Sequence, residues 1–424
     1  MKMKLWTGVL LVLLLGAVTI LTLAGCEKKI TSKGMAIPEP QQELLHNFDV
    51  ALANASNNFG LELFKKLMDE KENVFISPTS IYTALAMTLN GARDETLEAM
   101  AAVLGIGGVE LQRFNENNLA RLYQLQEADP DVIFNIANSL WMREGMEFDP
   151  DFVELSGNYY NASARELDFN TREAVDIINE WVELRTNGLI DETVEYPIDP
   201  YTVLFLINAV YFLGEWSEPF NPELTINRTF QGPAGDIGDV PFMQRDAGFS
   251  YLEQEGEFQA VRLPYGDTER LAMYVFLPDE QLSLAEFVAG LDGEKWDGWR
   301  SQFKTMQGSL SLPRFSMEYE KSLNDVLEAM GMEIAFDENR ADFFDMVERK
   351  DGPRLYISEV KHKSFIEVDE VGTEAAAVTS VEIRVESAPL DYFWMDVNRP
   401  FFFLIHDGEL NEILFCGTVM NPTD

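Results

Sequence analysis

From Phe48 to the C-terminus the chain continues without a low-complexity stretch, an internal repeat or a second linker. Apolar residues fall at helical spacing in the first part of this run, as at Phe59, Leu63 and Leu67. The later part is rich in β-branched and aromatic runs bounded by turn residues, which is typical of strands. Helices followed by long strands in mixed order predict a single α+β domain built on a large sheet.

Several segments of this domain carry clear local signals. We expect helices at 59–67, 78–91 and 94–104, and a further helix that contains 179–185 and stops at Asn187-Gly188. Asp94 is the expected N-cap of the third helix, because an aspartate side chain can accept hydrogen bonds from the free amides there. We expect strands at 132–142, 203–212, 258–263, 271–277, 356–368, 401–406 and 413–419.

The N-terminus has the pattern of an export signal. Lys2 and Lys4 precede an apolar run from Leu5 to Leu23 that contains no charge. The run ends in Leu-Ala-Gly-Cys, with the cysteine at Cys26, and this ending resembles a bacterial lipobox. The resemblance implies a signal peptide over residues 1–25 and a lipid on Cys26, which becomes the new N-terminus. The alternative is a transmembrane anchor, since a run of this length could just span a bilayer.

The segment after Cys26 is polar and contains Pro38 and Pro40. Such a composition predicts a flexible tether, here over residues 26–46, that lifts the folded domain at 47–424 off a membrane. The protein is therefore expected to be secreted and held at the cell surface or the outer face of a membrane.

The composition excludes several classes of function. The 72 acidic and 32 basic residues give a formal net charge of −40, which disfavours nucleic acid as a partner. The two cysteines, Cys26 and Cys416, exclude a disulfide framework and a cysteine-based zinc cluster. The sequence contains no G-x-S-x-G, H-E-x-x-H or C-x-x-C motif. We expect no enzymatic activity, no cofactor and no metal.

A series of segments in unbroken order resembles the serpin family of serine protease inhibitors. The matching segments are 73–81 with 84–87, 208–216 with 219–220, 310–315, 341–343, 355–370, 398–403 and 414–419. The resemblance spans about residues 47–424, and the lipobox identifies the chain as a prokaryotic lipoprotein member. It implies a large central mixed β-sheet with smaller sheets, about eight to nine helices and an exposed reactive-centre loop at about 370–396.

The segment of this loop alternates with period two. One face carries Thr373, Ala375, Ala377, Thr379, Val381, Ile383 and Val385. The other face carries Glu374, Ala376, Val378, Ser380, Glu382, Arg384 and Glu386. From the residues alone this is a half-buried strand, already paired. The resemblance instead implies an exposed bait loop that inserts into the central sheet after cleavage, starting from a metastable fold.

The resemblance also assigns roles around this loop. The hinge consists of Glu370, Gly372, Thr373, Glu374, Ala375, Ala376 and Ala377. Glycine can adopt backbone angles closed to other residues, so Gly372 is expected to be a pivot. The small, uncharged side chains can enter a packed sheet without overpacking it or burying a charge.

The sheet has to open for insertion, and the resemblance places a shutter under the opening at Ser77, Ser80, Asn208 and His362, with Trp216 where the loop enters. The simpler interpretation is that the two serines lie at a helix–sheet contact and that His362 is a satisfied buried histidine. The two interpretations are compatible, and neither needs a catalytic residue.

Family spacing places the scissile bond between Glu386 and Ser387, with cleavage after Val385 or Arg384 as alternatives. The implied function is a suicide inhibitor that traps a serine protease, or a papain-like cysteine protease, as a covalent acyl-enzyme. The protein is expected to be a monomer that contacts the membrane through Cys26. The alternative is a non-inhibitory serpin that acts as a surface binding protein; the small residues of the hinge favour inhibition.

Overall fold

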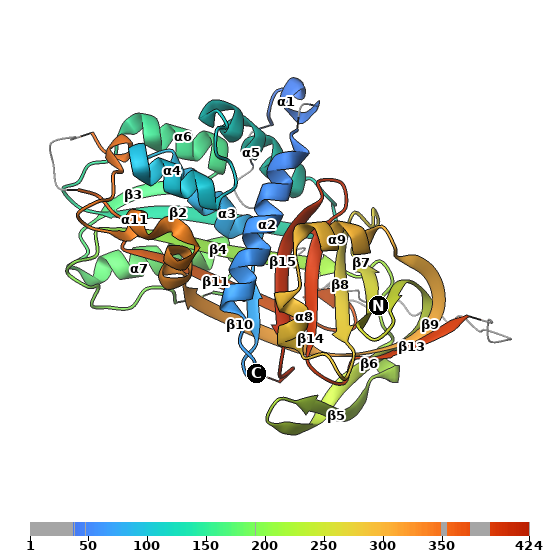
Figure 1. The fold of residues 1–424 in the computed structure, drawn as a ribbon. Helices are drawn as coiled ribbons and strands as arrows, with labels where there is room; N and C mark the ends of the chain where they lie inside the picture. Colours follow the sequence, from blue (N-terminus) through green and yellow to red (C-terminus); the bar gives the residue numbers. More distant parts are fainter. Residues whose placement is uncertain are drawn as a thin grey trace, which may run out of the picture. The chain divides into compact units, whose positions relative to one another are not determined.

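The structure, a computed structural model, describes residues 37, 39–46, 48–190, 192–348, 354–373 and 391–423. Two β-sheets and the helices packed on them make up this part of the chain (Figure 1). The helices are α1 (Gln42–His46), α2 (Val50–Leu67), α3 (Pro78–Leu89), α4 (Asp94–Val103), α5 (Leu111–Gln126), α6 (Pro150–Tyr160), α7 (Arg172–Arg185), α8 (Leu284–Ala289), α9 (Gly293–Arg300), α10 (Asn324–Leu327) and α11 (Glu333–Phe336). These described segments outnumber the expected eight to nine helices because α1, α10 and α11 are only one turn long.

The strands alternate with these helices along the chain. They are β1 (Val74–Ile76), β2 (Val132–Arg143), β3 (Ser163–Leu167), β4 (Leu204–Glu215), β5 (Ile226–Gly232), β6 (Gly235–Gln254), β7 (Phe258–Pro264), β8 (Leu271–Pro278), β9 (Lys304–Pro313), β10 (Phe315–Ser322), β11 (Glu359–Val368), β12 (Gly372–Thr373), β13 (Tyr392–Asp396), β14 (Phe401–Asp407) and β15 (Glu412–Val419).

The central sheet has six strands in the order β10-β11-β12-β4-β2-β3. Its strand β11 runs parallel to β4 and antiparallel to β10, so the sheet is mixed. The second sheet has nine strands in the order β1-β15-β14-β8-β7-β6-β9-β13, with β5 paired to β6. The expected smaller sheets are thus continuous through the long strand β6. The α+β architecture with a large mixed sheet is confirmed.

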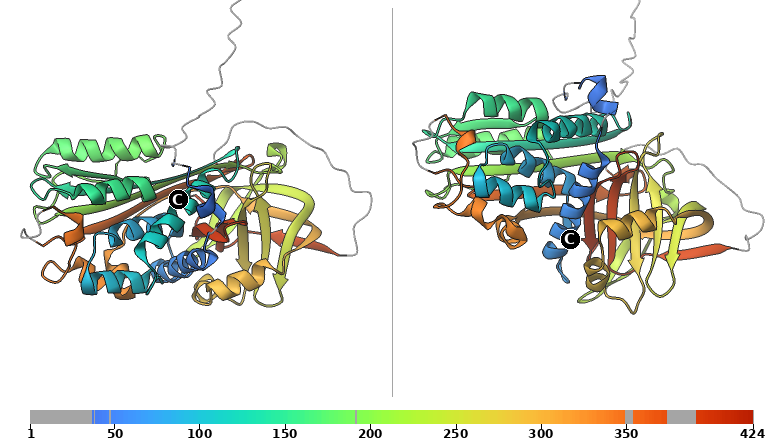
Figure 2. Two further views of the ribbon diagram at one scale, coloured as in Figure 1. Left: turned by 90° about the horizontal axis from the view of Figure 1, so that it is seen from above. Right: turned by 45° about the horizontal axis from the view of Figure 1, so that its top comes forward.

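Helices cover both faces of the central sheet (Figure 2). Phe205 and Ile207 of β4 pack with Ile178 of α7 on one face. Leu206, whose side chain points the other way, packs with Leu85 of α3. Strand β4 is therefore buried along almost its whole length, as a strand covered on both sides must be. Helix α3 is buried at every position because it lies between the two sheets.

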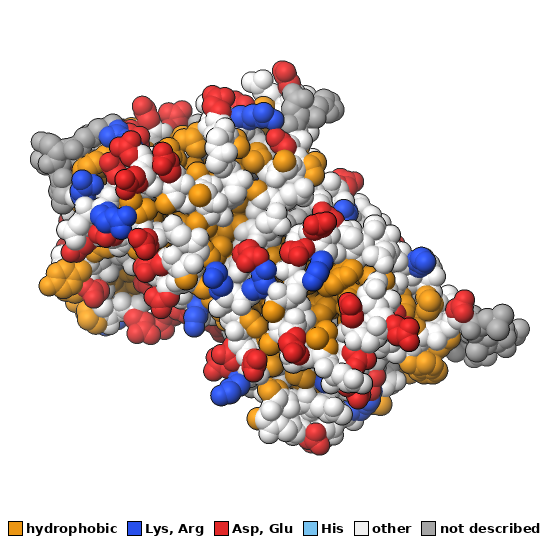
Figure 3. Space-filling view, viewed as in Figure 1, with side chains coloured by type: hydrophobic (Ala, Val, Ile, Leu, Met, Phe, Trp, Pro, Cys, Tyr) orange, Lys and Arg blue, Asp and Glu red, His pale blue; other side chains and the backbone are white. Residues whose placement is uncertain are grey.

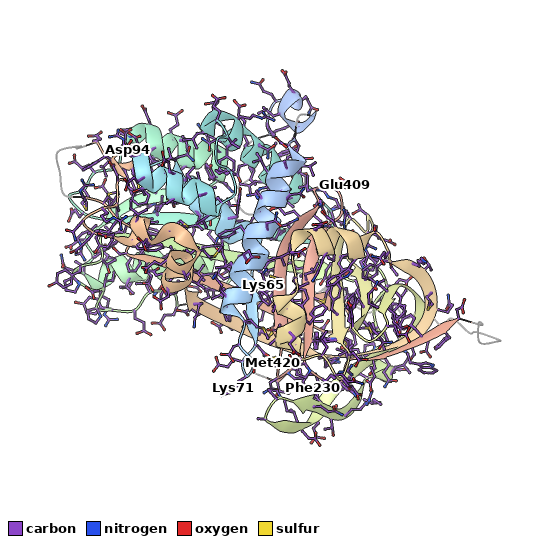
Figure 4. All side chains as sticks on the ribbon, viewed as in Figure 1. Lys65, Lys71, Asp94, Phe230, Glu409 and Met420 are labelled. Atoms are coloured by element: carbon purple, nitrogen blue, oxygen red, sulfur yellow. The ribbon has the colours of Figure 1, made fainter. Side chains whose placement is uncertain are left out.

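The expected helix at 94–104 is present, but its expected cap is wrong. Arg93 occupies the N-cap position, and no side chain caps the helix. Asp94 is the first helical residue, with a φ of 43°, and it lies at the start of α4 in Figure 4. The backbone of Arg93 instead donates to the carbonyl of Asp342, so a contact distant in sequence fixes this helix start.

The expected tether contains ordered structure at its C-terminal end. Helix α1 lies within residues 26–46, and the amide of Ile37 donates to Oε1 of Gln126 on α5 at 3.0 Å. The expected strand at 356–368 begins only at Glu359, and that at 203–212 continues to Glu215. None of the helices among the described residues has the length and apolar character needed to cross a membrane.

Candidate functional site

The candidate site is the place where β11 and β4 separate. The two strands pair in parallel from Glu359 opposite Phe205 to Ser364 opposite Val210. Beyond this ladder, β12 lies between them and pairs antiparallel with both strands. Thr373 is opposite Val368 on one side and Gly214 on the other. The central sheet therefore already holds the first two residues of an additional strand.

Thr373 has its side chain inside the protein. It is fully buried, and its hydroxyl lies 2.9 Å from the hydroxyl of Tyr265. The Tyr265 ring stacks on Trp216, with centroids 4.5 Å apart. Burial raises the pKa of Tyr265 well above its usual value, so the phenol stays neutral and can donate to Thr373. Thr373 is therefore on the buried face of the sheet, as its place in a half-buried strand pattern requires.

Gly372 is needed here because of a close approach between two backbones. A Cβ at this position would lie 2.2 Å from the carbonyl oxygen of Gly214 and 2.7 Å from the Cα of Glu215. The φ of Gly372 is not positive in this conformation, and its expected role as a pivot stays a prediction. Any larger residue would push β12 away from β4.

A short turn connects β11 to β12. The Asp369 carboxylate accepts hydrogen bonds from the amides of Val371 and Gly372, at 2.8 and 3.1 Å. The Asp369 carbonyl accepts from the indole Nε1 of Trp216 at 2.9 Å. The amide of Trp216 donates to the Val371 carbonyl at 2.8 Å. Trp216 thus fixes this turn at the place where the loop begins, as expected.

Glu370 is the charged residue of the turn, and it is almost completely buried. Its carboxylate pairs with Arg314 at 2.5 Å and also accepts a hydrogen bond from Thr225. Burial acts to raise the pKa of Glu370, but the hydrogen bonds from Arg314 and Thr225 outweigh burial and hold the pKa below its usual value. Glu370 is therefore ionised and ties the hinge to the junction between β9 and β10, through Arg314, and to the residue before β5, through Thr225.

Farther down the sheet, a row of polar side chains crosses three neighbouring strands. His362 of β11 is opposite Asn208 of β4, which in turn is opposite Asn138 of β2. The His362 Nδ1 lies 2.7 Å from Oδ1 of Asn208, and the Asn208 Nδ2 lies 2.6 Å from Oδ1 of Asn138. Since β11 and β4 must separate for a strand to enter, the His362–Asn208 hydrogen bond is a direct link across the opening.

The two shutter serines lie below this row, at the start of α3. Ser77 caps α3 by accepting from the amide of Ser80, and its hydroxyl donates to the Leu414 carbonyl of β15 at 2.7 Å. The Ser80 hydroxyl accepts from Nδ2 of Asn208 at 2.5 Å. These contacts agree with the simpler interpretation, in which the two serines lie at a helix–sheet contact, and they are compatible with the expected shutter role, which stays a prediction.

The hydrogen bonds of His362 define its protonation state. Nε2 accepts from the amide of Ser77 at 3.3 Å, so Nδ1 carries the proton and donates to Asn208. Burial lowers the pKa of His362 from 6.5 to about 3. The ring is thus neutral at physiological pH, and a second proton on Nε2 would face the Ser77 N–H.

Sequence reasoning missed several members of this site: Asn138, Asp369, Tyr265, Arg314 and Ser364, whose hydroxyl donates to the Phe75 carbonyl. Asn138 had a signal, since it is a polar residue inside an expected apolar strand. The others come from segments whose packing the local sequence does not reveal.

The remaining predicted residues lie outside the described part of the chain. They are Cys26, Glu374, Ala375, Ala376, Ala377, Arg384, Val385, Glu386 and Ser387. Within the described ranges, no group of three or more His, Cys, Asp or Glu side chains is arranged to hold a metal ion. The residues around β12 are packed and hydrogen-bonded to both neighbouring strands of the sheet.

A family model described as Serpin (serine protease inhibitor) matches residues 54–422. The chain belongs to the serpin family. Serpins are typically protease inhibitors.

Relatives match this serpin over most of their length. An uncharacterized serpin-like protein of Thermococcus kodakarensis is 37% identical over 378 residues, which cover 88% of this chain and 86% of the relative. Human Serpin B8 is 34% identical over 384 residues, covering 88% and 99% of the two chains. The structure of the thermophilic serpin tengpin in its native state has a TM-score of 0.81 and 36% identity, covering 88% of this serpin and 95% of tengpin.

Proposed function

We propose that this serpin is a single-use inhibitor that traps a serine protease, or a papain-like cysteine protease, as a covalent acyl-enzyme. The nucleophile of the protease attacks the carbonyl carbon of Glu386, and Ser387 leaves with the new amino terminus. The freed segment then inserts between β11 and β4 and carries the attached protease with it. The observation that carries this proposal is β12, which lies in register between these strands.

The register of β12 specifies where each inserted residue would go. Six residues beyond Thr373, the same antiparallel pairing brings Thr379 opposite both His362 and Asn208. Its side chain would share the inward face of Thr373, because alternate residues of a strand point the same way. The Thr379 hydroxyl could then replace one partner of the broken His362–Asn208 hydrogen bond. A polar group that small fits the buried row without an unpaired charge.

Insertion leads to a more stable state, which the uncleaved loop cannot form because both of its ends are held. The inserted strand forms two ladders, one with β11 and one with β4, in place of the single β11–β4 ladder that breaks, and alternate residues bond to alternate sides. The inserted residues also bury their inward side chains, and each hydrogen bond gained contributes about 1 kcal/mol. Some 15 residues at ~3.3 Å each would move the attached protease by roughly 50 Å. The other candidate function, a non-inhibitory surface binding protein, does not require the small residues that follow Thr373.

The decisive experiment mixes the protein with Glu-specific, elastase-like, trypsin-like and papain-like proteases. Denaturing gels detect a covalent complex, and mass spectrometry gives the start of the small released fragment. A denaturant-resistant complex and a fragment starting at Ser387 are expected. A different fragment start would move the scissile bond to Val385 or Arg384. Cleavage by every protease with a complex from none would contradict inhibition and favour the binding protein.

We also propose that the protein is exported and held at a membrane surface by a lipid on Cys26, as a monomer. The support is the Leu-Ala-Gly-Cys ending of the apolar run at residues 5–23. Cys26→Ala should abolish incorporation of labelled fatty acid and leave residues 1–25 uncleaved. Unchanged labelling of that variant would exclude the lipid site.

A further inference from the structure

Strand β13, the edge strand of the nine-stranded sheet, begins at Tyr392, shortly after the reactive-centre loop (Figure 1). Phe393 and Met395 point inward, and the Phe393 ring stacks on Tyr251 with centroids 4.0 Å apart. Tyr392 and Trp394 point the other way, and their ring centroids are 5.0 Å apart. Trp394 is 72% exposed, which is unusual for so large an apolar side chain. Trp394 fills no place in the core that would account for so large an apolar side chain at this position.

Carboxylates surround the two rings. Trp394 is opposite Ser309 of β9, and Ser309 is opposite Asp246 of β6, so all three share a row across the sheet. Strands are ~4.8 Å apart, which places the Trp394 and Asp246 backbones roughly 10 Å from each other. Asp391 precedes β13, and both aspartates are exposed. In Figure 3, hydrophobic and acidic side chains gather at the lower right, over the outer end of β13.

Arg228, which reaches this edge of the sheet, is already engaged. Arg228 donates to both carboxylate oxygens of Asp396 and to the hydroxyl of Ser311. It therefore does not neutralise Asp246 or Asp391. Asp246 accepts a hydrogen bond from the Tyr392 hydroxyl at 3.5 Å, and no ion pair within the described part of the chain neutralises its charge. An exposed indole beside such a carboxylate suits a guanidinium or ammonium group from outside, which can lie on the ring and pair with the acid at once.

The position of these residues points to the partner. Ser387 and Trp394 are seven residues apart, so they lie within about 25 Å of each other. A globular domain of some 200 residues is about 40 Å across. A protease whose active site holds the bond before Ser387 would therefore extend over the exposed face of β13.

We propose that Tyr392, Trp394, Asp246 and Asp391, the β13 patch, form a second contact for the target protease. The patch binds an arginine or lysine side chain on the rim of the protease's substrate cleft. This inference rests on the proposed function, and it adds a specificity determinant outside the loop. The choice of protease then depends on the basic residues of the rim as well as on Glu386.

The test measures binding of the intact serpin to each of the four proteases with its catalytic Ser or Cys replaced by Ala, which removes trapping from the measurement. Trp394→Ala should weaken binding roughly tenfold, and Asp246→Asn about threefold, with the latter effect shrinking at high salt. Tyr201→Ala is the matched control, because Tyr201 is 81% exposed but distant in sequence from β13. It should leave the dissociation constant unchanged. Thermal midpoints should agree for all variants.

Each outcome decides a separate claim. Equal binding by wild type and Trp394→Ala, or no binding of any inactive protease, would overturn the β13 patch. Weaker binding by Trp394→Ala together with cleavage but no covalent complex from active protease would overturn the inhibitory function and leave the patch standing. A wild-type dimer that Trp394→Ala converts to a monomer would assign the patch to a second copy of this chain instead.

Discussion

At the scale of single residues, Thr373 decides whether the segment can enter the sheet. Its side chain is fully buried and its hydroxyl is paired with Tyr265. The space is therefore matched to a small polar group, and a charge there would have no partner. Burying an unpaired charge costs several kcal/mol, which is more than the few hydrogen bonds of β12 can offset.

We predict that Thr373→Arg converts the inhibitor into a substrate. Its loop should be cut at the same bond, but the covalent complex should disappear from denaturing gels. Thr373→Ser keeps the hydroxyl and should retain trapping. Persistent complex formation by Thr373→Arg would contradict insertion through this part of the sheet.

His362 gives the site a pH dependence with a definite sign. Its folded pKa of about 3 lies below the unfolded value of 6.5. Between these values the unfolded chain binds the proton and the folded chain does not. The contribution of neutral His362 to the free energy of unfolding is therefore complete above pH 6.5 and is lost as the pH falls towards 3.

We predict that wild type loses about 2 kcal/mol more free energy of unfolding than His362→Gln between pH 7 and pH 5. Glutamine can donate to Asn208 and accept from Ser77 without titrating in this range. His406→Gln should behave similarly, since burial also lowers the pKa of His406 to about 3. Parallel pH profiles for wild type and His362→Gln, from urea titrations, would show that His362 does not carry this dependence.

At the scale of elements, the parallel ladder of β11 and β4 is the part that has to separate. On its other side β11 stays paired with β10, where Lys363 is opposite Glu320. Across the opening, Lys363 is opposite Ala209. A crosslink at position 363 can therefore join β11 either to β4, across the opening, or to β10, on the other side.

We predict that a disulfide between Ala209→Cys and Lys363→Cys blocks trapping without blocking cleavage. Neighbouring strands are close enough for such a bond, and Cys416 is buried and does not compete. Reductant should restore the complex. The control pair Glu320→Cys and Lys363→Cys loses the same lysine, but it should form the covalent complex both with and without reductant. If the oxidised control also fails to trap, the loss of trapping in the first pair would reflect strain rather than a locked opening.

The elements also show what the sequence can and cannot predict. The buried strands β8 and β15 lie within one or two residues of their expected bounds, because continuous apolar runs identify them locally. The period-two alternation that begins at Thr373 indicated a strand, but it did not identify the partners of β12, since Val368 and Gly214 come from two other strands. Arg314 was missed because its partner, Glu370, is distant in sequence. The shutter residues were available only through the family resemblance, and the structure shows how they meet.

At the scale of the whole molecule, the central sheet has an unfilled position. Below β12 the strands β11 and β4 pair with each other, and a longer strand between them would add a row of hydrogen bonds and buried side chains. Under the proposed insertion mechanism, the arrangement in this structure is therefore not the most stable one that the chain can form once the loop is cut.

We predict that cutting the loop raises the thermal midpoint by on the order of 10 °C or more, because the inserted strand adds stability throughout the central sheet. Calorimetry before and after limited proteolysis checks this. Cut Thr373→Arg should show no rise. A lower midpoint for the cut wild-type protein would mean that the segment stays outside the sheet.

Strand β12 also bears on timing. In the proposed mechanism, water can hydrolyse the ester to the protease at any moment, so trapping depends on whether insertion is faster than release. Strand pairing is slowest at its first step, because two chain segments must come together, at a cost in conformational entropy, before any hydrogen bond forms. Here that step precedes the arrival of the protease, because Thr373 is already seated. Whether the protease is trapped or released then depends on how fast the residues after Thr373 add to the strand compared with hydrolysis of the ester.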